Sequence, residues 1–148
     1  MGKIMREVAK KHNLTLEELN ELGEKEEWVD KEADALTVKI GKKQDNFIFV
    51  ARLAYHFIPN SIKVYLECDV KVGAKRIIKD LDESRDVEKF ENIKEAIEKL
   101  NKRVQSDKLR YEKYYQLNPF DKSNYDLVID TTYLNIQQVL DKLMDLIE

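Results

Sequence analysis

Three short apolar runs, rich in β-branched and aromatic residues, constrain the fold of this sequence more than any other feature. They occupy residues 47–50, 62–66 and 127–129, the second with one lysine in it, and helix-like sequence separates each run from the next. Runs of this length are typical of buried strands in a parallel sheet whose connections are helices. We therefore expect an α/β fold with three parallel strands, at 47–51, 62–67 and 127–129, covered by helices.

The sequence around these runs has the apolar spacing of amphipathic helices. Thr15 and Glu18 form the pattern of a capping box, which predicts that a helix begins there. Gly23 is expected to end that helix, and Gly41 is expected to end the next one. The predicted helices cover residues 3–12, 15–23, 30–40, 70–80 and 88–115 and the chain after Asn135, with a charged loop over 79–86.

The composition limits the class of protein. A chain of 148 residues has the length of one domain, and 4 Gly with 2 Pro are too few turn residues for an all-β sandwich. The net charge of −3 provides no basic field for duplex nucleic acid. The single cysteine, Cys68, excludes an internal disulfide framework and a cysteine metal cluster. With no apolar run of roughly 20 residues and no signal-peptide pattern, we expect a cytoplasmic protein that binds neither membrane nor nucleic acid.

Several common catalytic motifs are absent from the sequence. His12 and His56 stand far apart, so no metal site is predicted. Ser106 and Ser123 lack the glycine elbow of a serine hydrolase. None of the 4 glycines lies in a Gly-rich phosphate loop between a strand and a helix. Arginine is the remaining residue type that could carry chemistry.

Three charged residues are spaced i, i+4, i+7 on the long predicted helix. Arg103, Asp107 and Arg110 fall within a narrow stripe, so that one carboxylate lies beside two guanidiniums. Such a stripe can hold two bidentate phosphate donors in place, with Asp107 kept ionised. The alternative is a solvated row of ion pairs, which contributes only a few tenths of a kcal/mol.

Further basic residues lie near the ends of the predicted strands. Arg52 follows the run at 47–50, at the carboxyl end of a predicted strand, where parallel sheets bind their ligands. A surface arginine at the start of a helix is the alternative. Arg76, Lys79 and Arg85 flank the polar loop after the second strand, and an exposed basic loop is the alternative for these three.

Several segments, in order along the whole chain, carry a resemblance to a known family. The stripe from Arg103 to Tyr111 resembles a lid-helix signature that grips a nucleoside monophosphate. The other segments are residues 2–7, 14–20, 29–32, 49–53, 85–86 and 125–132. On these segments the chain resembles the cytidylate kinases, of the short archaeal and candidate-phyla type, within the P-loop nucleoside monophosphate kinase family.

The resemblance implies a three-layer α/β/α kinase fold with a parallel sheet, as a single domain over residues 1–148. Its parts are the monophosphate-binding helices at 1–46, core strands and a helix at 47–78, the lid and long helix at 79–116, and the last strand and helix at 117–148. The implied reaction transfers the γ-phosphate of ATP, with Mg²⁺, to CMP or dCMP. No protein ligand for Mg²⁺ is identified in the sequence.

The resemblance also implies roles for the charged residues. Asp107 would contact the nucleoside of the acceptor and orient the two arginines beside it. Arg103 and Arg85 would act in catalysis. The residues implied to bind the acceptor nucleotide are Gly2, Arg6, Arg52, Arg103, Asp107 and Arg110. The residues implied to contact the ATP phosphates from the lid are Arg76, Lys79 and Arg85.

Two departures from the family pattern alter these expectations. The family begins with a strand, a Gly-rich phosphate loop and a helix, for which this chain has no counterpart, and Ala51 stands where the family usually has glycine. We expect that the chain starts at a position inside the family's sequence pattern, through a mis-called start, a fragment or a natural loss, and that it is inactive by itself.

The strands at 47–51 and 62–67 would flank the missing strand, and their open edges would favour self-association. The alternatives are a non-catalytic remnant that binds a nucleotide or a partner chain, and a purely structural α/β domain.

Overall fold

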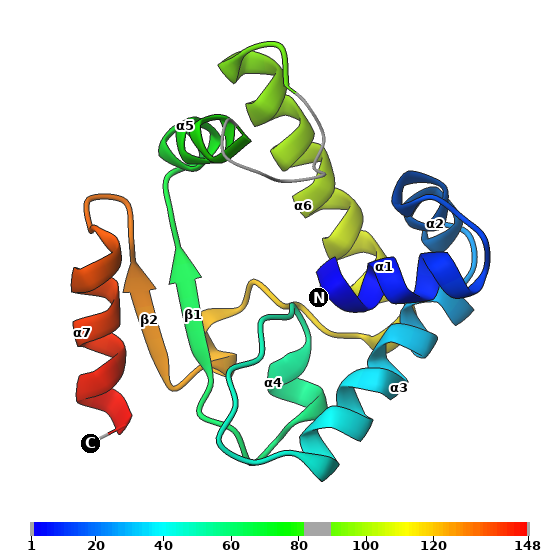
Figure 1. The fold of residues 1–148 in the computed structure, drawn as a ribbon, viewed down its shortest axis with the longest axis horizontal. Helices are drawn as coiled ribbons and strands as arrows, with labels where there is room; N and C mark the ends of the chain where they lie inside the picture. The colour runs from blue at the N-terminus through cyan, green and yellow to red at the C-terminus, as the bar shows by residue number, and fades with distance from the viewer. Residues whose placement is uncertain (1, 82–89, 148) are drawn as a thin grey trace. The chain divides into compact units, whose positions relative to one another are not determined.

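The computed structural model describes residues 2–81 and 90–147, and this part of the chain is mostly helical, with one small parallel sheet (Figure 1). An α/β structure is therefore confirmed. The chain divides into two compact units. The first comprises Met1–Lys63 and Lys108–Asn124, and the second comprises Val64–Asp107 and Tyr125–Glu148. The expectation of one kinase-like domain stays a prediction.

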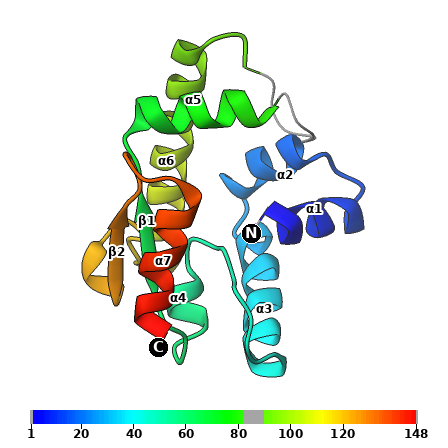
Figure 2. The same ribbon diagram turned by 60° about the vertical axis from the view of Figure 1, so that its left-hand side comes forward.

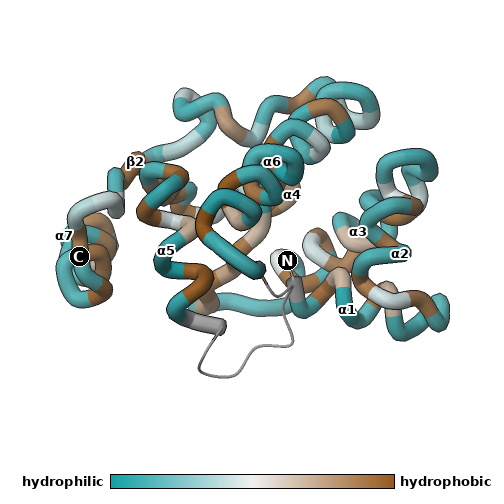
Figure 3. Tube along the Cα trace, turned by 90° about the horizontal axis from the view of Figure 1, so that it is seen from above, coloured by the Kyte–Doolittle hydropathy of each residue, from teal (hydrophilic) through white to brown (hydrophobic). Residues whose placement is uncertain are grey.

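Three helices form the core of the first unit: α1 (Gly2–Lys11), α2 (Leu16–Gly23) and α3 (Trp28–Lys43). They lie side by side (Figure 2), and each alternates between hydrophobic and hydrophilic positions (Figure 3), as expected of helices that bury one face. The short helix α4 (Ala54–Phe57) and the C-terminal part of α6 (Ile93–Tyr115) belong to the same unit. The side chains that meet in its apolar core are Ile4, Met5, Val8, Ala9, Leu19, Val29 and Ala33.

The start of α2 confirms the predicted capping box. Thr15 Oγ1 accepts a hydrogen bond from the backbone N–H of Glu18 at 3.1 Å, and Glu18 Oε2 accepts one from the backbone N–H of Thr15 at 2.7 Å. These bonds satisfy N–H groups that a helix start otherwise leaves without a partner. The bond from the Thr15 amide also lowers the pKa of the Glu18 carboxyl.

The two glycines predicted to end helices behave differently from one another. Gly41 lies inside α3, which continues to Lys43, so the prediction that α3 ends at Gly41 is wrong. A Cβ built on Gly41 would lie 2.9 Å from Cγ1 of Ile58, so glycine allows α3 to approach the end of α4 closely. α2 does end at Gly23, as predicted, but no glycine in the described ranges has a positive φ, so Gly23 is not a left-handed helix stop.

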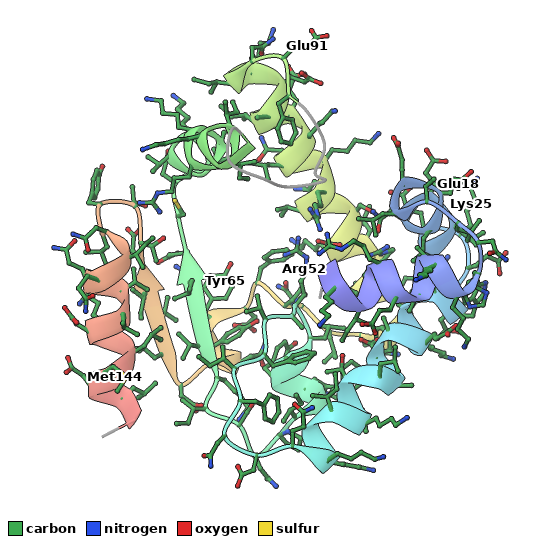
Figure 4. The ribbon with its side chains drawn as sticks, viewed as in Figure 1. Glu18, Lys25, Arg52, Tyr65, Glu91 and Met144 are labelled. Atoms are coloured by element: carbon green, nitrogen blue, oxygen red, sulfur yellow. The ribbon has the colours of Figure 1, made fainter. Side chains whose placement is uncertain are left out.

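The second unit contains the sheet, which consists of β1 (Val64–Glu67) and β2 (Leu127–Asp130). The two strands run parallel, with Val64 opposite Leu127 at one end of the register. Two of the three predicted strands, and their parallel direction, are therefore confirmed. The rings of Tyr65 on β1, labelled in Figure 4, and Tyr125 before β2 lie 5.0 Å apart between centroids and add an aromatic contact to this pairing.

The helices α5 (Val70–Leu81) and α7 (Ile136–Ile147) follow β1 and β2, and α7 lies alongside β2 (Figures 1 and 2). Both helices were predicted from apolar spacing and are confirmed. Asn135 caps α7, because its Oδ1 accepts from the N–H of Gln138 at 2.9 Å. In the ranges that the structure describes, no helix has the length and apolarity needed to cross a membrane.

The long helix α6 starts later than predicted, at Ile93 instead of residue 88. Residues 90–92 are not helical, and residues 88 and 89 lie outside the described part of the chain. Asn92 sets the start, since its Oδ1 accepts from the N–H of Glu95 at 3.0 Å. The prediction of a loop from residue 79 is wrong at its start, because α5 continues to Leu81; the rest of that predicted loop lies outside the described residues.

The strand predicted at 47–51 is wrong, because residues 47–50 belong to no strand. Their side chains alternate as in a strand: Ile48 is 94% and Val50 is 77% exposed, while Phe49 packs against the core of the first unit. A strand also needs a neighbouring strand with which it exchanges backbone hydrogen bonds. No strand in the described ranges pairs with this segment. The apolar run therefore predicted a strand, whereas the described residues place this segment outside the β1–β2 sheet.

Candidate functional site

One face of α3 buries two carboxylates. The buried residues of this helix are Val29, Asp30, Ala33, Asp34 and Thr37, so Asp30 and Asp34 lie one turn apart on its buried face. Asp30 is 3% and Asp34 is 5% exposed. A buried carboxylate is costly unless an opposite charge or a hydrogen-bond donor accompanies it. Both carboxylates meet such a group on the C-terminal part of α6.

Arg110 is the partner of Asp30. Its Nε lies 3.4 Å from Oδ2 of Asp30, and the side chain of Arg110 is only 10% exposed. The guanidinium also packs against α2, because a Cβ built on Gly23 would lie 2.9 Å from Nη1 of Arg110. Its Cζ lies 5.5 Å from the centre of the Tyr111 ring. An arginine that the sequence singled out for phosphate binding is therefore held between α2 and α3 within the first unit.

Tyr115 is the partner of Asp34. Its O–H donates to Oδ2 of Asp34 at 2.5 Å. The pKa of Asp34 is raised to about 6. Burial is the main cause and the charge of Asp30 adds to it, while the Tyr115 bond and the charge of Arg110 oppose the increase. Burial, followed by the bond to Asp34, also raises the pKa of the Tyr115 hydroxyl. The Tyr115 hydroxyl therefore stays protonated, and can donate, at neutral pH. The Tyr115 ring packs edge-on against the Phe57 ring, with 5.8 Å between the ring centroids.

Arg103, Asp107 and Arg110 all lie on α6, as the sequence predicted. They differ in exposure: Arg103 is exposed, whereas Asp107 and Arg110 are buried. The sequence predicted that Asp107 lies beside both arginines. The structure gives Arg110 an ion-pair partner from α3, Asp30, and buries it while Arg103 is exposed, so the two arginines have different surroundings.

The other predicted acceptor-binding residues of the first unit come from α1 and from the segment before α4. Gly2 is the first residue of α1, and Arg6 is exposed on that helix because Met5 and its apolar neighbours face the core. Arg52 is half-buried, next to the fully buried Leu53 that precedes α4, and Figure 4 labels it in the connection between α3 and α4. The roles of these residues in acceptor binding stay predictions.

Arg76 of α5 binds the chain itself. Its Nη2 donates to the carbonyls of Thr131 at 2.8 Å, Leu134 at 3.1 Å and Thr132 at 3.2 Å, which fastens α5 to the loop after β2. A contact between Nη2 of Arg76 and the ATP phosphates would compete with these bonds. Lys79 is exposed in the last turn of α5. Arg85 lies outside the described residues, and the lid roles of all three residues stay predictions.

The described side chains do not include a group of three His, Cys, Asp or Glu residues that could hold a metal ion. We therefore assign no protein ligand for Mg²⁺ in residues 2–81 and 90–147. Asp30 and Asp34 form a pair without a third ligand, and their neighbours Arg110 and Tyr115 are donors rather than metal ligands.

Sequence reasoning missed Asp30, Asp34 and Tyr115. A signal for the first two was present, because Asp30 and Asp34 are spaced i, i+4 and share a helix face with Ala33 and Thr37. Carboxylates on the apolar face of an amphipathic helix are rare unless they are paired, so this pattern could have marked a buried polar site. Tyr115 carried no such signal, because its partner lies on a helix far away in the sequence.

Comparison with known proteins decides the family. The family model described as "Cytidylate kinase" matches residues 27–148. The chain belongs to the cytidylate kinase family. The resemblance seen in the sequence motifs is therefore confirmed, and Arg52, Arg103, Asp107 and Arg110 all lie within the matched range. Gly2 and Arg6 precede that range.

Several archaeal cytidylate kinases are similar to the chain over most of its length. The protein of Sulfolobus acidocaldarius is 34% identical over 148 residues, which cover 99% of this chain and 77% of that protein. The protein of Methanocaldococcus jannaschii is 34% identical over 143 residues, which cover 93% of this chain and 75% of that protein. The protein of Methanosarcina barkeri is 31% identical over 143 residues, which cover 95% of this chain and 76% of that protein. No solved structure matches the chain.

Proposed function

We propose that this chain carries the acceptor-binding part of a nucleoside monophosphate kinase that phosphorylates CMP or dCMP with ATP as donor. Membership of the cytidylate kinase family over residues 27–148 is the observation that carries the proposal. In this proposal the two-stranded parallel sheet and its helices are part of the three-layer P-loop kinase fold that the family implies. The chain acts on free nucleotides and needs neither nucleic acid nor a membrane as a partner.

The arginines supply the chemistry of acceptor binding. Arg6, Arg52 and Arg110 offer guanidiniums to the phosphate of CMP, and the family resemblance assigns Arg103 to acceptor binding and catalysis as well. Phosphoryl transfer requires little covalent work from the protein, so that positioning and compensation of negative charge are its main contributions. A guanidinium suits this task because its donors match two phosphate oxygens at once. Asp107 contacts the nucleoside, and Arg76, Lys79 and Arg85 contribute from the lid.

Replacing Arg52 with alanine is expected to weaken CMP binding by about 1.5–3 kcal/mol, the usual contribution of a hydrogen bond to a charged group. Isothermal titration of the purified chain with CMP measures this loss. Lys102→Ala removes the same charge from an exposed position on α6 and should change little. Equal losses in the two variants would mean that CMP responds only to overall positive charge and would contradict an Arg52 site.

The 148-residue chain is expected to bind CMP without transferring phosphate from ATP to it. Its 4 glycines form no Gly-rich loop, and the backbone cradle and lysine of such a loop are what hold the β- and γ-phosphates in this class of kinase. A coupled assay with CMP and MgATP measures turnover, and CMP titration of the same preparation shows that the acceptor site is folded. Turnover of about 1–100 s⁻¹, normal for kinases, would contradict this expectation.

A further inference from the structure

Arg110 is surrounded by buried groups that the acceptor-binding proposal does not use. Asp30 contacts its Nε, Gly23 leaves room for its Nη1, and Asp34 lies one helical turn from Asp30, bound by Tyr115. We call Gly23, Asp30, Asp34 and Tyr115 the Arg110 seat. All four residues and Arg110 belong to the first unit.

The contact from Asp30 is made at the nitrogen that controls the orientation of the guanidinium. Nε lies at the inner end of the planar group, so a carboxylate at Nε restricts rotation of the plane. The distance of 3.4 Å is longer than the roughly 2.7–2.9 Å of the strongest charge-assisted hydrogen bonds. The contact of Asp30 at Nε is therefore an ion pair rather than a hydrogen bond, and a phosphate that binds Arg110 would be held by the terminal amino groups of the guanidinium.

Asp34 and Tyr115 hold the α3 side of this arrangement in place. The Tyr115 hydroxyl fixes Oδ2 of Asp34, and the Tyr115 ring is itself packed against Phe57 and against Tyr111, whose centroid is 6.4 Å away. These contacts tie the last turn of α6 to the middle of α3. Arg110 and Asp30 lie directly beside this tie, so it fixes the distance between their backbones.

Stability alone does not account for two carboxylates on the apolar face of α3. A buried ion pair is often no more stabilising than apolar side chains of the same volume. By contrast, a carboxylate that orients an arginine for an incoming anion has to be buried beside that arginine. Burial leaves the arginine side chain few other conformations.

We propose that Asp30, supported by Asp34 and Tyr115, is a positioning residue that aims the Arg110 guanidinium at the phosphate group of the acceptor nucleotide. The inference rests on the proposed function, because it takes the acceptor to be CMP. It adds to that function a set of residues that never touch the nucleotide but determine how tightly its phosphate is held.

The first test observes Arg110 in the full chain without nucleotide. In an NMR spectrum of the Arg Nε–Hε groups, the Arg110 signal is assigned by its loss in Arg110→Lys. We expect a sharp signal whose proton exchanges slowly with water in the wild-type chain, and a broadened or rapidly exchanging signal in Asp30→Asn. An Arg110 signal that is equally sharp and slow in both proteins would overturn the role of Asp30.

The second test compares CMP with cytidine, which has no phosphate, by titration. Asp30→Asn is expected to weaken CMP binding about tenfold or more and Tyr115→Phe about threefold to tenfold, in line with coupling between residues in contact. Tyr114→Phe is the matched control: it removes a hydroxyl from the preceding residue of α6 and should leave CMP affinity within about twofold. The affinity for cytidine should change little in all three variants.

The outcomes separate the inference from the proposed function. A wild-type chain that does not bind CMP would overturn the proposed function and the phosphate role of the seat, and the NMR signal would then decide whether Asp30 holds Arg110. Equal losses for CMP and cytidine would overturn the inference while leaving CMP binding intact, as would an unchanged or tighter CMP affinity in Asp30→Asn. Tyr115→Phe keeps its ring contacts, so it tests the inference even if Asp30→Asn does not fold.

Discussion

Replacing Arg110 with alanine is expected to lower the free energy of unfolding by about 3–5 kcal/mol, because the change leaves Asp30 as a buried charge without its ion-pair partner. Urea unfolding monitored by circular dichroism measures this loss. The expected effect is much larger than that of a surface charge, since both side chains are buried in the first unit. The same variant should also lose CMP affinity, but that loss can be interpreted only under conditions in which the variant is folded.

Two further variants make this prediction specific. Arg103→Ala removes an exposed arginine from the same helix and should change the stability by less than about 1 kcal/mol. The double variant Asp30→Asn/Arg110→Ala should recover part of the stability lost in Arg110→Ala, because the buried charge is removed together with its partner. If the double variant were less stable than Arg110→Ala, the loss would come from packing of the arginine side chain rather than from an uncompensated Asp30.

Replacing Asp34 with asparagine is expected to stabilise the chain by about 3 kcal/mol at pH 7.5 and to have little effect below pH 4. Burial raises the pKa of Asp34 from its usual 3.8 to about 6 in the folded chain. The folded state therefore binds the Asp34 proton more tightly than the unfolded state does. As the pH rises from about 4 to about 6, the free energy of unfolding of the wild-type chain falls, and it then stays lower by a constant amount.

Asparagine cannot ionise, and its side-chain carbonyl can still accept the hydrogen bond from Tyr115. The measurement is the difference in unfolding free energy between Asp34→Asn and wild type, at several pH values from 4 to 7.5. Taking the difference cancels the other titrating groups near Asp34, namely Asp30, Arg110 and Tyr115, to the extent that the substitution leaves them unchanged. Asp45→Asn makes the same chemical change at an exposed position and should give a small difference without this pH dependence. A difference for Asp34→Asn that is flat with pH would contradict the burial of an ionisable Asp34.

The helices show how far local sequence determines structure. The capping box of Thr15 and Glu18 and the position of α7 after Asn135 could be located because their hydrogen bonds join residues three apart. The start of α6 was missed by several residues, although Asn92 is a local cap as well, because the apolar spacing extends past it to Phe90. Apolar periodicity indicates that a helix exists more reliably than where it begins.

The glycines and the first predicted strand depended on partners that are distant in sequence. Gly41 carries the signal of a helix stop, yet its position opposite Ile58 explains why glycine occurs within α3. Residues 47–50 have the composition and alternation of a strand, but a strand forms only when another chain segment accepts its backbone hydrogen bonds. For Gly41 and for residues 47–50, the local sequence pattern was present, but the secondary structure that it usually indicates did not form.

The candidate site divides in the same way. The α/β class, the family, the stripe on α6 and the helices that carry Arg6, Arg76 and Arg110 could be predicted from sequence, because each depends on motifs or periodicity within a single segment. The pairing of Arg110 with Asp30, the bond from Tyr115 to Asp34 and the bonds of Arg76 to the carbonyls after β2 became visible in the folded chain alone. A buried charge takes its partner from whichever element packs beside it, and the spacing of residues along one helix carries no information about which element that is.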